Sequence, residues 1–189
     1  MNIVEVGFKL DESFEYYDKL LRKNGMINDF FSVTRDIYYT NKKLDGLSEL
    51  EMKKSCIRLR SCNNSDFVIE NNLLDVFNQK SINIIELESY EKIINEYNFF
   101  KIFDTLKHDY HYVKDGMNSK IQIQNIDNIG LVIYFDNSKY YHLDESMQRK
   151  MLIDELNSYG FDFTYEDLGI DKLRTLYYGK EMFSHNQNS

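Results

Sequence analysis

Apolar and polar residues alternate along several short segments of the chain. In residues 3–10, the apolar side chains of Val4, Val6 and Phe8 alternate with polar residues or glycine. A period of two residues is typical of a β-strand with one buried face. Similar segments predict further strands at residues 33–39, 55–60, 67–70, 110–114, 120–124 and 131–136.

Apolar residues recur with helical spacing in three other segments. The first is predicted to begin after a cap at Asp11 and to end before Gly25. The second covers residues 89–97, and the third covers about 144–159 and ends at Gly160. Strands outnumber helices and are joined by short polar turns. This order predicts an α+β fold in which helices pack against an antiparallel sheet.

The length and composition fit one domain of ordinary size. The chain has 189 residues, and we expect a single domain over residues 1–183 followed by a frayed polar tail at residues 184–189. It contains no Pro and no Trp, but 15 Tyr and 13 Phe. Turns must therefore use Asn, Asp and Gly, and aromatic side chains must supply much of the core.

The net charge narrows the possible partners. Lys and Arg number 23 and Asp and Glu number 31, a formal charge of −8. This balance argues against general binding of nucleic acid, although a local basic site remains compatible with it. The longest apolar run, residues 130–135, is far shorter than the roughly 20 residues of a membrane helix. We expect a soluble, cytoplasmic protein with no membrane partner.

Polar side chains occupy one whole face of several predicted strands. Arg58 and Arg60 share a face, and Ile57 and Leu59 occupy the other. An open antiparallel sheet with one solvated side would give this pattern, and so would a cupped sheet whose polar concave side lines a ligand cavity. The arginines favour the cupped sheet, because neighbouring guanidinium groups repel unless an anion lies between them.

The order of these segments resembles that of a known family. Residues 5–9 resemble the first-strand motif Glu-x-Glu-x-Lys of the CYTH superfamily, the triphosphate tunnel enzymes that include class IV adenylate cyclases and thiamine triphosphatases. Residues 36–39 are similar to its Asp-x-Tyr-Tyr/Phe strand, and residues 57–60 to its Leu-Arg-x-Arg strand. Residues 121–130, 134–136 and 173–178 resemble its later motifs, so the resemblance covers nearly the whole chain.

The resemblance implies a closed eight-stranded antiparallel β tunnel with flanking helices, in which basic residues bind a triphosphate. The positions that match the family's phosphate-binding residues are Lys9, Arg58, Arg60 and Lys107. Glu5 and Asp136 match its ligands for Mg²⁺ or Mn²⁺, hard cations that prefer carboxylate oxygens.

The sequence departs from the family pattern at four acidic or basic positions. Gly7, Gln124 and Tyr134 replace three of the five expected acids. Glu70 stands where the family tends to place a phosphate-binding Lys, and it is a candidate replacement metal ligand. The two remaining carboxylates could hold one Mg²⁺ that keeps several waters.

Three functions are compatible with these residues. The first is an enzyme that hydrolyses a triphosphate with a divalent metal, or that cyclises ATP. The second is a non-catalytic protein that binds polyphosphate or a nucleotide in the same tunnel. The third is a sheet that serves only as a protein-interaction surface, which the paired arginines disfavour. We expect a small-molecule triphosphate or polyphosphate as the partner.

Overall fold

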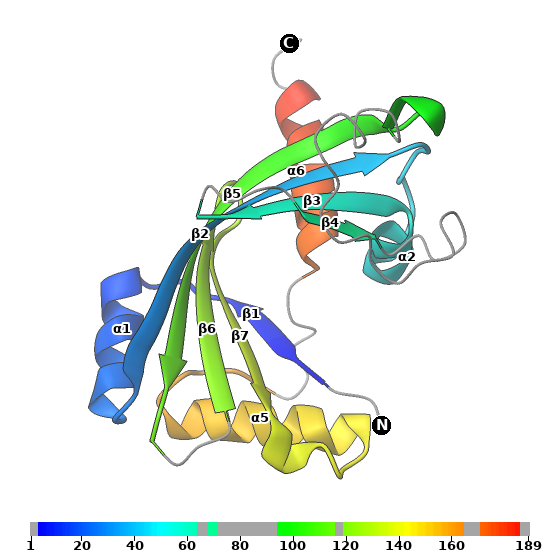
Figure 1. The fold of residues 1–189 in the computed structure, drawn as a ribbon. Helices are drawn as coiled ribbons and strands as arrows, with labels where there is room; N and C mark the ends of the chain where they lie inside the picture. Colours follow the sequence, from blue (N-terminus) through cyan, green and yellow to red (C-terminus); the bar gives the residue numbers. More distant parts are fainter. Residues whose placement is uncertain (1–3, 64–67, 72–93, 116–118, 165–170, 186–189) are drawn as a thin grey trace. The chain divides into compact units, whose positions relative to one another are not determined.

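The computed structural model describes residues 4–63, 68–71, 94–115, 119–164 and 171–185. Within these residues seven strands form one sheet in the order β1-β7-β6-β5-β2-β3-β4 (Figure 1). The strands are β1 (Val6–Lys9), β2 (Ile27–Thr40), β3 (Cys56–Cys62), β4 (Val68–Asn71), β5 (Phe100–Val113), β6 (Ser119–Ile126) and β7 (Gly130–Asn137). The helices are α1 (Phe14–Lys23), α2 (Glu49–Lys54), α5 (Glu145–Ser158), α6 (Lys172–His185) and the 3-10 turn η1 (Ser138–Tyr140).

The predicted α+β class is confirmed. Neighbouring strands pair antiparallel in the ladders β1–β7, β6–β7, β2–β3 and β3–β4, and helices flank the sheet. The strand order starts at β1 and ends at β4, so the described residues form an open series of seven strands. The closed tunnel of eight strands is therefore not shown.

The chain divides into two compact units. The first unit contains Met1–Phe31, His108–Ile126 and Gly130–Ile170. The second contains Ser32–Lys107, Asp127–Ile129 and Asp171–Ser189. The long strands β2 and β5 contribute residues to both units.

The core of the first unit lies between its strands and the helices α1 and α5. In β1, Val6 and Phe8 are buried, as the alternation predicts, and Lys9 is exposed. Side chains from β6, β7 and α5 join this core, including Ile123, Phe135 and Leu152. Burial of large apolar side chains by several elements is the main source of stability of such a unit.

Side-chain hydrogen bonds to backbone N–H groups define where the helices of the first unit begin. The cap of α1 is Ser13, whose side chain accepts from the backbone N–H of Tyr16 at 3.3 Å, and not Asp11 as predicted. For α5, Asp144 accepts from the N–H of Met147 at 2.9 Å, in agreement with the predicted start. Gly160 follows this helix with φ of +99°, a left-handed conformation that favours glycine.

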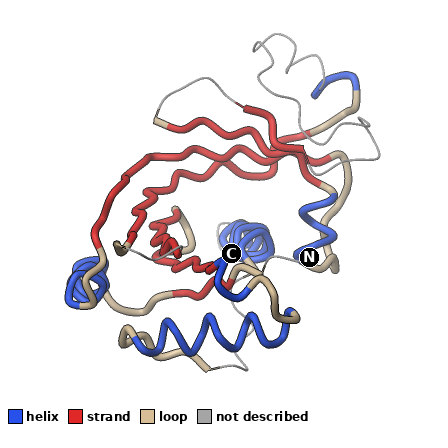
Figure 2. Tube along the Cα trace, turned by 60° about the horizontal axis from the view of Figure 1, so that its bottom comes forward, coloured by secondary structure: helices blue, strands red, loops and turns tan. Residues whose placement is uncertain are grey.

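The second unit has a different apolar cluster on each face of its strands. Ile37, Ile57 and Leu59 form one cluster with Phe99. On the opposite face, Tyr38 packs with residues of α2, β5 and α6, including Met52, Ile102 and Leu173. The helix α6 therefore covers the face of β2 and β3 that carries Tyr38 (Figure 2).

Several predicted elements differ from the observed ones at their ends. The strand predicted at residues 110–114 is the end of a longer strand, β5, and that at 33–39 lies within β2. Most of the helix predicted at residues 89–97 lies outside the described residues, although residues 94–96 are helical. The segment 173–178 and the tail residues Ser184 and His185 lie in α6, whereas 186–189 lie outside the described residues. No helix in the described part of the chain is long and apolar enough to cross a membrane.

Candidate functional site

A buried carboxylate, that of Asp36 in β2, organises a group of basic side chains in the second unit. Asp36 is fully buried and lies directly opposite Arg60 in the β2–β3 ladder. Opposite residues of an antiparallel pair project from the same face of the sheet. The Nε and Nη2 atoms of Arg60 donate to the two oxygens of Asp36 at 2.8 and 2.9 Å, a bidentate pair.

Two lysines from other elements approach the same carboxylate. The Nζ atom of Lys107, in β5, lies 2.9 Å from Asp36 Oδ2, and its side chain is only 2% exposed. The Nζ atom of Lys172, at the start of α6, lies 3.9 Å from the same oxygen, and its side chain is 14% exposed. Three cations from three elements therefore converge on one buried acid.

Arg58 lies beside this group on the same face of β3. It pairs with Tyr38 in the β2–β3 ladder, and its Nη1 atom donates to the Tyr38 hydroxyl at 3.5 Å. Its other neighbour in the sheet is Glu70, directly opposite in the β3–β4 ladder. We call Arg58, Arg60, Lys107 and Lys172 the cation cluster.

The charges of this cluster, together with burial, shift the pKa values of Asp36 and Lys172. Burial alone would raise the pKa of Asp36, but hydrogen bonds from Arg60 and the charges of Lys107 and Arg58 hold it well below its usual range. The pKa of Lys172 falls from 10.5 to about 7, first because of burial and then because of repulsion by Lys107. The charge of Asp36 opposes this shift, and the charges of Arg58 and Arg60 add to it.

The start of α6 is held in place by α2. The carboxylate of Glu49 accepts from the backbone N–H groups of Leu173 at 3.1 Å and Arg174 at 3.0 Å. These N–H groups belong to the first turn of a helix, which has no partners of its own within the helix. Because Lys172 immediately precedes them, Glu49 also positions its side chain.

The predicted site residues fall into both units. Arg58, Arg60 and Lys107 lie in the second unit, and the structure brings them together around Asp36. Glu5, Lys9 and Asp136 lie in the first unit. The prediction that all of them face one cavity stays a prediction.

Glu5 and Asp136 lie close together within the first unit. Val6 pairs with Phe135 in the β1–β7 ladder, so Glu5 lies next to Asp136 where the pairing ends. The hydroxyl of Tyr141 donates to Asp136 at 3.2 Å, and both carboxylates help to raise the pKa of Tyr141, after burial. Lys9 is exposed at the other end of β1, opposite Val132.

Glu5 and Asp136 are enough to bind Mg²⁺ or Mn²⁺ only if waters or ligand oxygens complete the coordination. Mg²⁺ is commonly bound by one or two carboxylates together with waters and phosphate oxygens of a ligand. Glu5 and Asp136 could supply that pair. The described residues contain no group of three or more His, Cys, Asp or Glu that could hold a metal by themselves.

Two of the three positions that the resemblance predicts to be acidic, Gly7 and Tyr134, are neighbours in the sheet of the first unit. Gly7 lies directly opposite Tyr134 in the β1–β7 ladder, and Tyr134 lies opposite Gln122 in the β6–β7 ladder. Gln124 is buried, and its Oε1 atom accepts no hydrogen bond within the described part of the chain. A glycine, an amide and an aromatic ring thus occupy the three positions that the resemblance predicts to be acidic.

Sequence reasoning missed two members of this site. Asp36 has a place in the sequence only through the Asp-x-Tyr-Tyr resemblance, and its neighbours Arg35 and Ile37 give no signal of a buried charge. Lys172 gave no signal, because its role depends on α6 packing against β2, a contact between segments distant in the sequence.

No family model and no curated protein matches the sequence. Solved structures do match. PH1012 from Pyrococcus horikoshii OT3 has a TM-score of 0.58 and 16% identity, over 86% of this chain and 92% of that chain. PH1819 from the same organism has a TM-score of 0.58 and 14% identity, over 96% and 98%. A candidate adenylate cyclase from Vibrio parahaemolyticus has a TM-score of 0.53 and 12% identity, over 82% and 87%. The chain therefore shares its fold with these three proteins.

Proposed function

We propose that the protein binds the phosphate groups of a triphosphate or polyphosphate at the cation cluster, as a divergent CYTH-like protein. One observation carries this proposal: Arg60, Lys107 and Lys172 converge on the single buried carboxylate of Asp36. Asp36 carries one negative charge, and three basic side chains approach it. A phosphate chain would supply further charge and acceptor oxygens to the guanidinium and ammonium groups.

The fold comparison supports the same assignment at a coarser level. The chain shares its fold with a candidate adenylate cyclase, and its motifs resemble those of the CYTH superfamily. Similarity of fold suggests a class of site but does not identify a substrate. The choice among tripolyphosphate, a nucleoside triphosphate and thiamine triphosphate, and the closure of the sheet into a tunnel, belong to the proposal.

Two outcomes are proposed for the bound ligand. In the first, Glu5 and Asp136 hold Mg²⁺ or Mn²⁺, which would stabilise charge on phosphoryl oxygens during hydrolysis or cyclisation. In the second, the protein binds without catalysis, because Gly7, Gln124 and Tyr134 replace acids of the family pattern. The loss of three acids favours slow turnover or none.

Isothermal titration with tripolyphosphate tests the binding site. We expect the double variant Arg58→Ala/Arg60→Ala to lose at least about tenfold in affinity, because each charge-assisted hydrogen bond contributes roughly 1.5–3 kcal/mol and about 1.4 kcal/mol is tenfold. The matched control is Arg35→Ala/Lys101→Ala. It removes two positive charges from the same unit, where both side chains are paired with Asp104, outside the cluster. If the wild-type protein shows no binding of millimolar tripolyphosphate, either with or without metal, the proposal is overturned.

A phosphate-release assay with Mg²⁺ and Mn²⁺ separates the two outcomes. If the protein is an enzyme, Glu5→Gln should abolish release and leave tripolyphosphate binding largely intact. If the wild type binds but releases no phosphate from any triphosphate in the panel, the non-catalytic outcome is correct. Turnover that survives Glu5→Gln would show that the metal ligands are assigned wrongly, with Glu70 as the next residue to change.

A further inference from the structure

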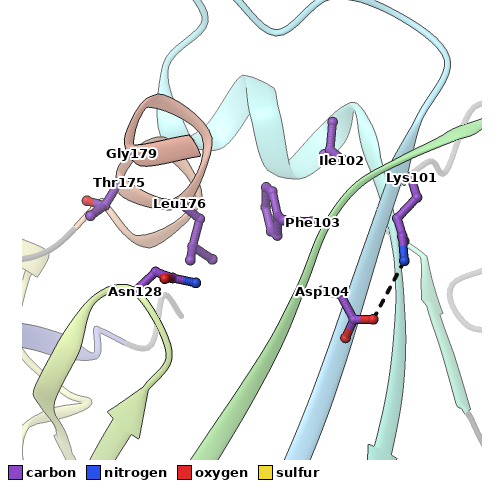
Figure 3. Close-up of a pocket in the computed structure, with 8 residues that line it drawn as sticks. All are labelled: Lys101, Ile102, Phe103, Asp104, Asn128, Thr175, Leu176 and Gly179. Carbon is purple, nitrogen blue, oxygen red and sulfur yellow. Dashed lines mark ion pairs between the residues drawn. The ribbon is translucent and has the colours of Figure 1, made fainter. Parts of the chain in front are cut away.

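A cavity of about 390 Å³ lies in the second unit, beside the exposed end of β5 (Figure 3). Its walls come from β5, from the turn that contains Asn128, and from α6. None of the four residues of the cation cluster lines it. Its volume lies within the range of about 300–1,000 Å³ that is usual for small-molecule sites.

The cavity walls are largely apolar. Ile102, Phe103 and Leu176 supply its hydrophobic surface. Gly179, in α6, leaves it open, because a Cβ atom placed there would meet nothing within 4 Å. A helix interior normally disfavours glycine, so the open space is obtained at some cost to the helix.

The polar groups of the cavity leave little net charge for a ligand to meet. Lys101 pairs with Asp104 at 3.8 Å, as the dashed line in Figure 3 marks. Asp104 also accepts two hydrogen bonds from Arg35, at 2.8 and 2.6 Å. The Asn128 side chain lies beside Leu176 in Figure 3, and an amide offers both donor and acceptor atoms.

We propose that this cavity binds an uncharged, planar heteroaromatic ring. An aromatic wall at Phe103 favours a flat ring through stacking, and the apolar walls disfavour a charged group. The amide of Asn128 can pair with the hydrogen-bonding edge of a heterocycle. The class of ligand is therefore a base-like ring and not a phosphate.

The cavity lies near the cation cluster, because its lining residue Phe103 packs beside Tyr38. The ring of Phe103 lies 4.7 Å from that of Tyr38, whose hydroxyl accepts from Arg58. The ring could therefore be the organic part of a phosphorylated ligand, or a separate small molecule that binds beside it. Only the first of these sources rests on the proposed function.

Ligand-observed NMR and isothermal titration test the proposal with three probes: adenosine, ATP and tripolyphosphate. Gly179→Leu should fill the cavity and lower the affinity for adenosine at least about tenfold, while Gly179→Ala, which adds one methyl group to the same helix, should bind it nearly as the wild type does. Asn128→Gly keeps a residue that tolerates the positive φ of 64° but removes the amide, and it should weaken adenosine several-fold. Tripolyphosphate should bind all three variants alike.

The pattern across probes identifies the source of the ring. If ATP binds more tightly than either adenosine or tripolyphosphate, and Gly179→Leu removes that difference, the ring is part of a phosphorylated ligand. If adenosine binds with the same affinity in the presence and absence of saturating tripolyphosphate, the ring belongs to a separate molecule. Because adenosine is one ring among several, the panel also includes cytidine and indole. No binding of any ring at millimolar concentration, or binding unaffected by Gly179→Leu, would overturn the proposal whether or not tripolyphosphate binds.

Discussion

At the residue scale, the buried carboxylate of Asp36 links β2 to β3 and β5 through ion pairs. Neighbouring residues of the same strands pack through apolar contacts. Arg60 in β3 and Lys107 in β5 both bind this acid, which is fully buried. Burying an ion costs several kcal/mol, and partners offset that cost only when they are close and well directed. The short distances at Asp36 meet that condition.

Asp36→Asn should therefore destabilise the protein by about 3–5 kcal/mol, because it leaves the buried cations without their counter-charge. Urea unfolding at pH 7 measures the change. The lowered pKa of Asp36 sets the pH dependence: its contribution is present above the unfolded pKa of about 4 and is lost as pH falls through the folded pKa. The difference between wild type and variant should shrink in acid.

The control for this prediction is Asp104→Asn. Asp104 also accepts a bidentate pair, from Arg35, but the arginine side chain is 51% exposed. Exposed pairs contribute about 0.2–1 kcal/mol. If Asp36→Asn cost no more than this control, the ion group around Asp36 would not be the organising feature of the second unit.

At the element scale, the contact between α2 and the start of α6 decides where Lys172 lies. Glu49→Ala removes the carboxylate that accepts from Leu173 and Arg174. We expect a loss of about 1–2 kcal/mol in the free energy of unfolding, as for other helix caps, and several-fold weaker binding of tripolyphosphate because Lys172 is no longer positioned.

Glu51→Ala separates these two effects. Glu51 belongs to the capping box of α2 itself, through its bonds with Ser48, and makes no bond to α6 in the described structure. The variant should lose similar stability and keep its affinity for tripolyphosphate. Equal losses of affinity in both variants would mean that α2 as a whole, and not Glu49, supports the site.

The sequence predicted elements better than it predicted their ends or partners. The alternation of Ile57 and Leu59 with Arg58 and Arg60 identified β3 and its polar face, because that pattern depends on the strand alone. The sequence predicts Asp11 as the cap of α1, but Asp11 and Ser13 are both good caps and only the backbone path selects Ser13. The grouping of Lys172 with Asp36 depends on a tertiary contact, which no local pattern records.

At the scale of the whole molecule, the overall charge and the local charge have opposite signs. The chain carries a formal charge of −8, yet four basic side chains gather around Asp36. Composition therefore argues against a broad basic surface but does not reveal a local cluster of cations. The resemblance to the CYTH motifs predicts phosphate-binding roles for Arg58, Arg60 and Lys107, and the structure shows only that these residues lie near Asp36. The placement of Glu5, Lys9 and Asp136 relative to them remains a prediction.

The last prediction concerns the pH dependence of stability of the whole protein. The pKa of Lys172 is lowered to about 7 by burial and by Lys107, against about 10.4 in an unfolded chain. Between these values the unfolded state binds a proton that the folded state lacks, so stability should rise with pH. We expect urea unfolding to show a rise on the order of 1–3 kcal/mol from pH 7 to 9.5 in the wild type relative to Lys172→Met. The range stops at pH 9.5 because buried tyrosines with raised pKa values, such as Tyr140 at about 12, reverse the slope once unfolded tyrosines ionise near pH 10.

The control variant Lys101→Met, which removes a 54% exposed lysine, should keep the wild-type slope of stability against pH. Saturating tripolyphosphate should flatten it by favouring charged Lys172. A slope that is identical in Lys172→Met, or indifferent to tripolyphosphate, would separate Lys172 from the proposed site.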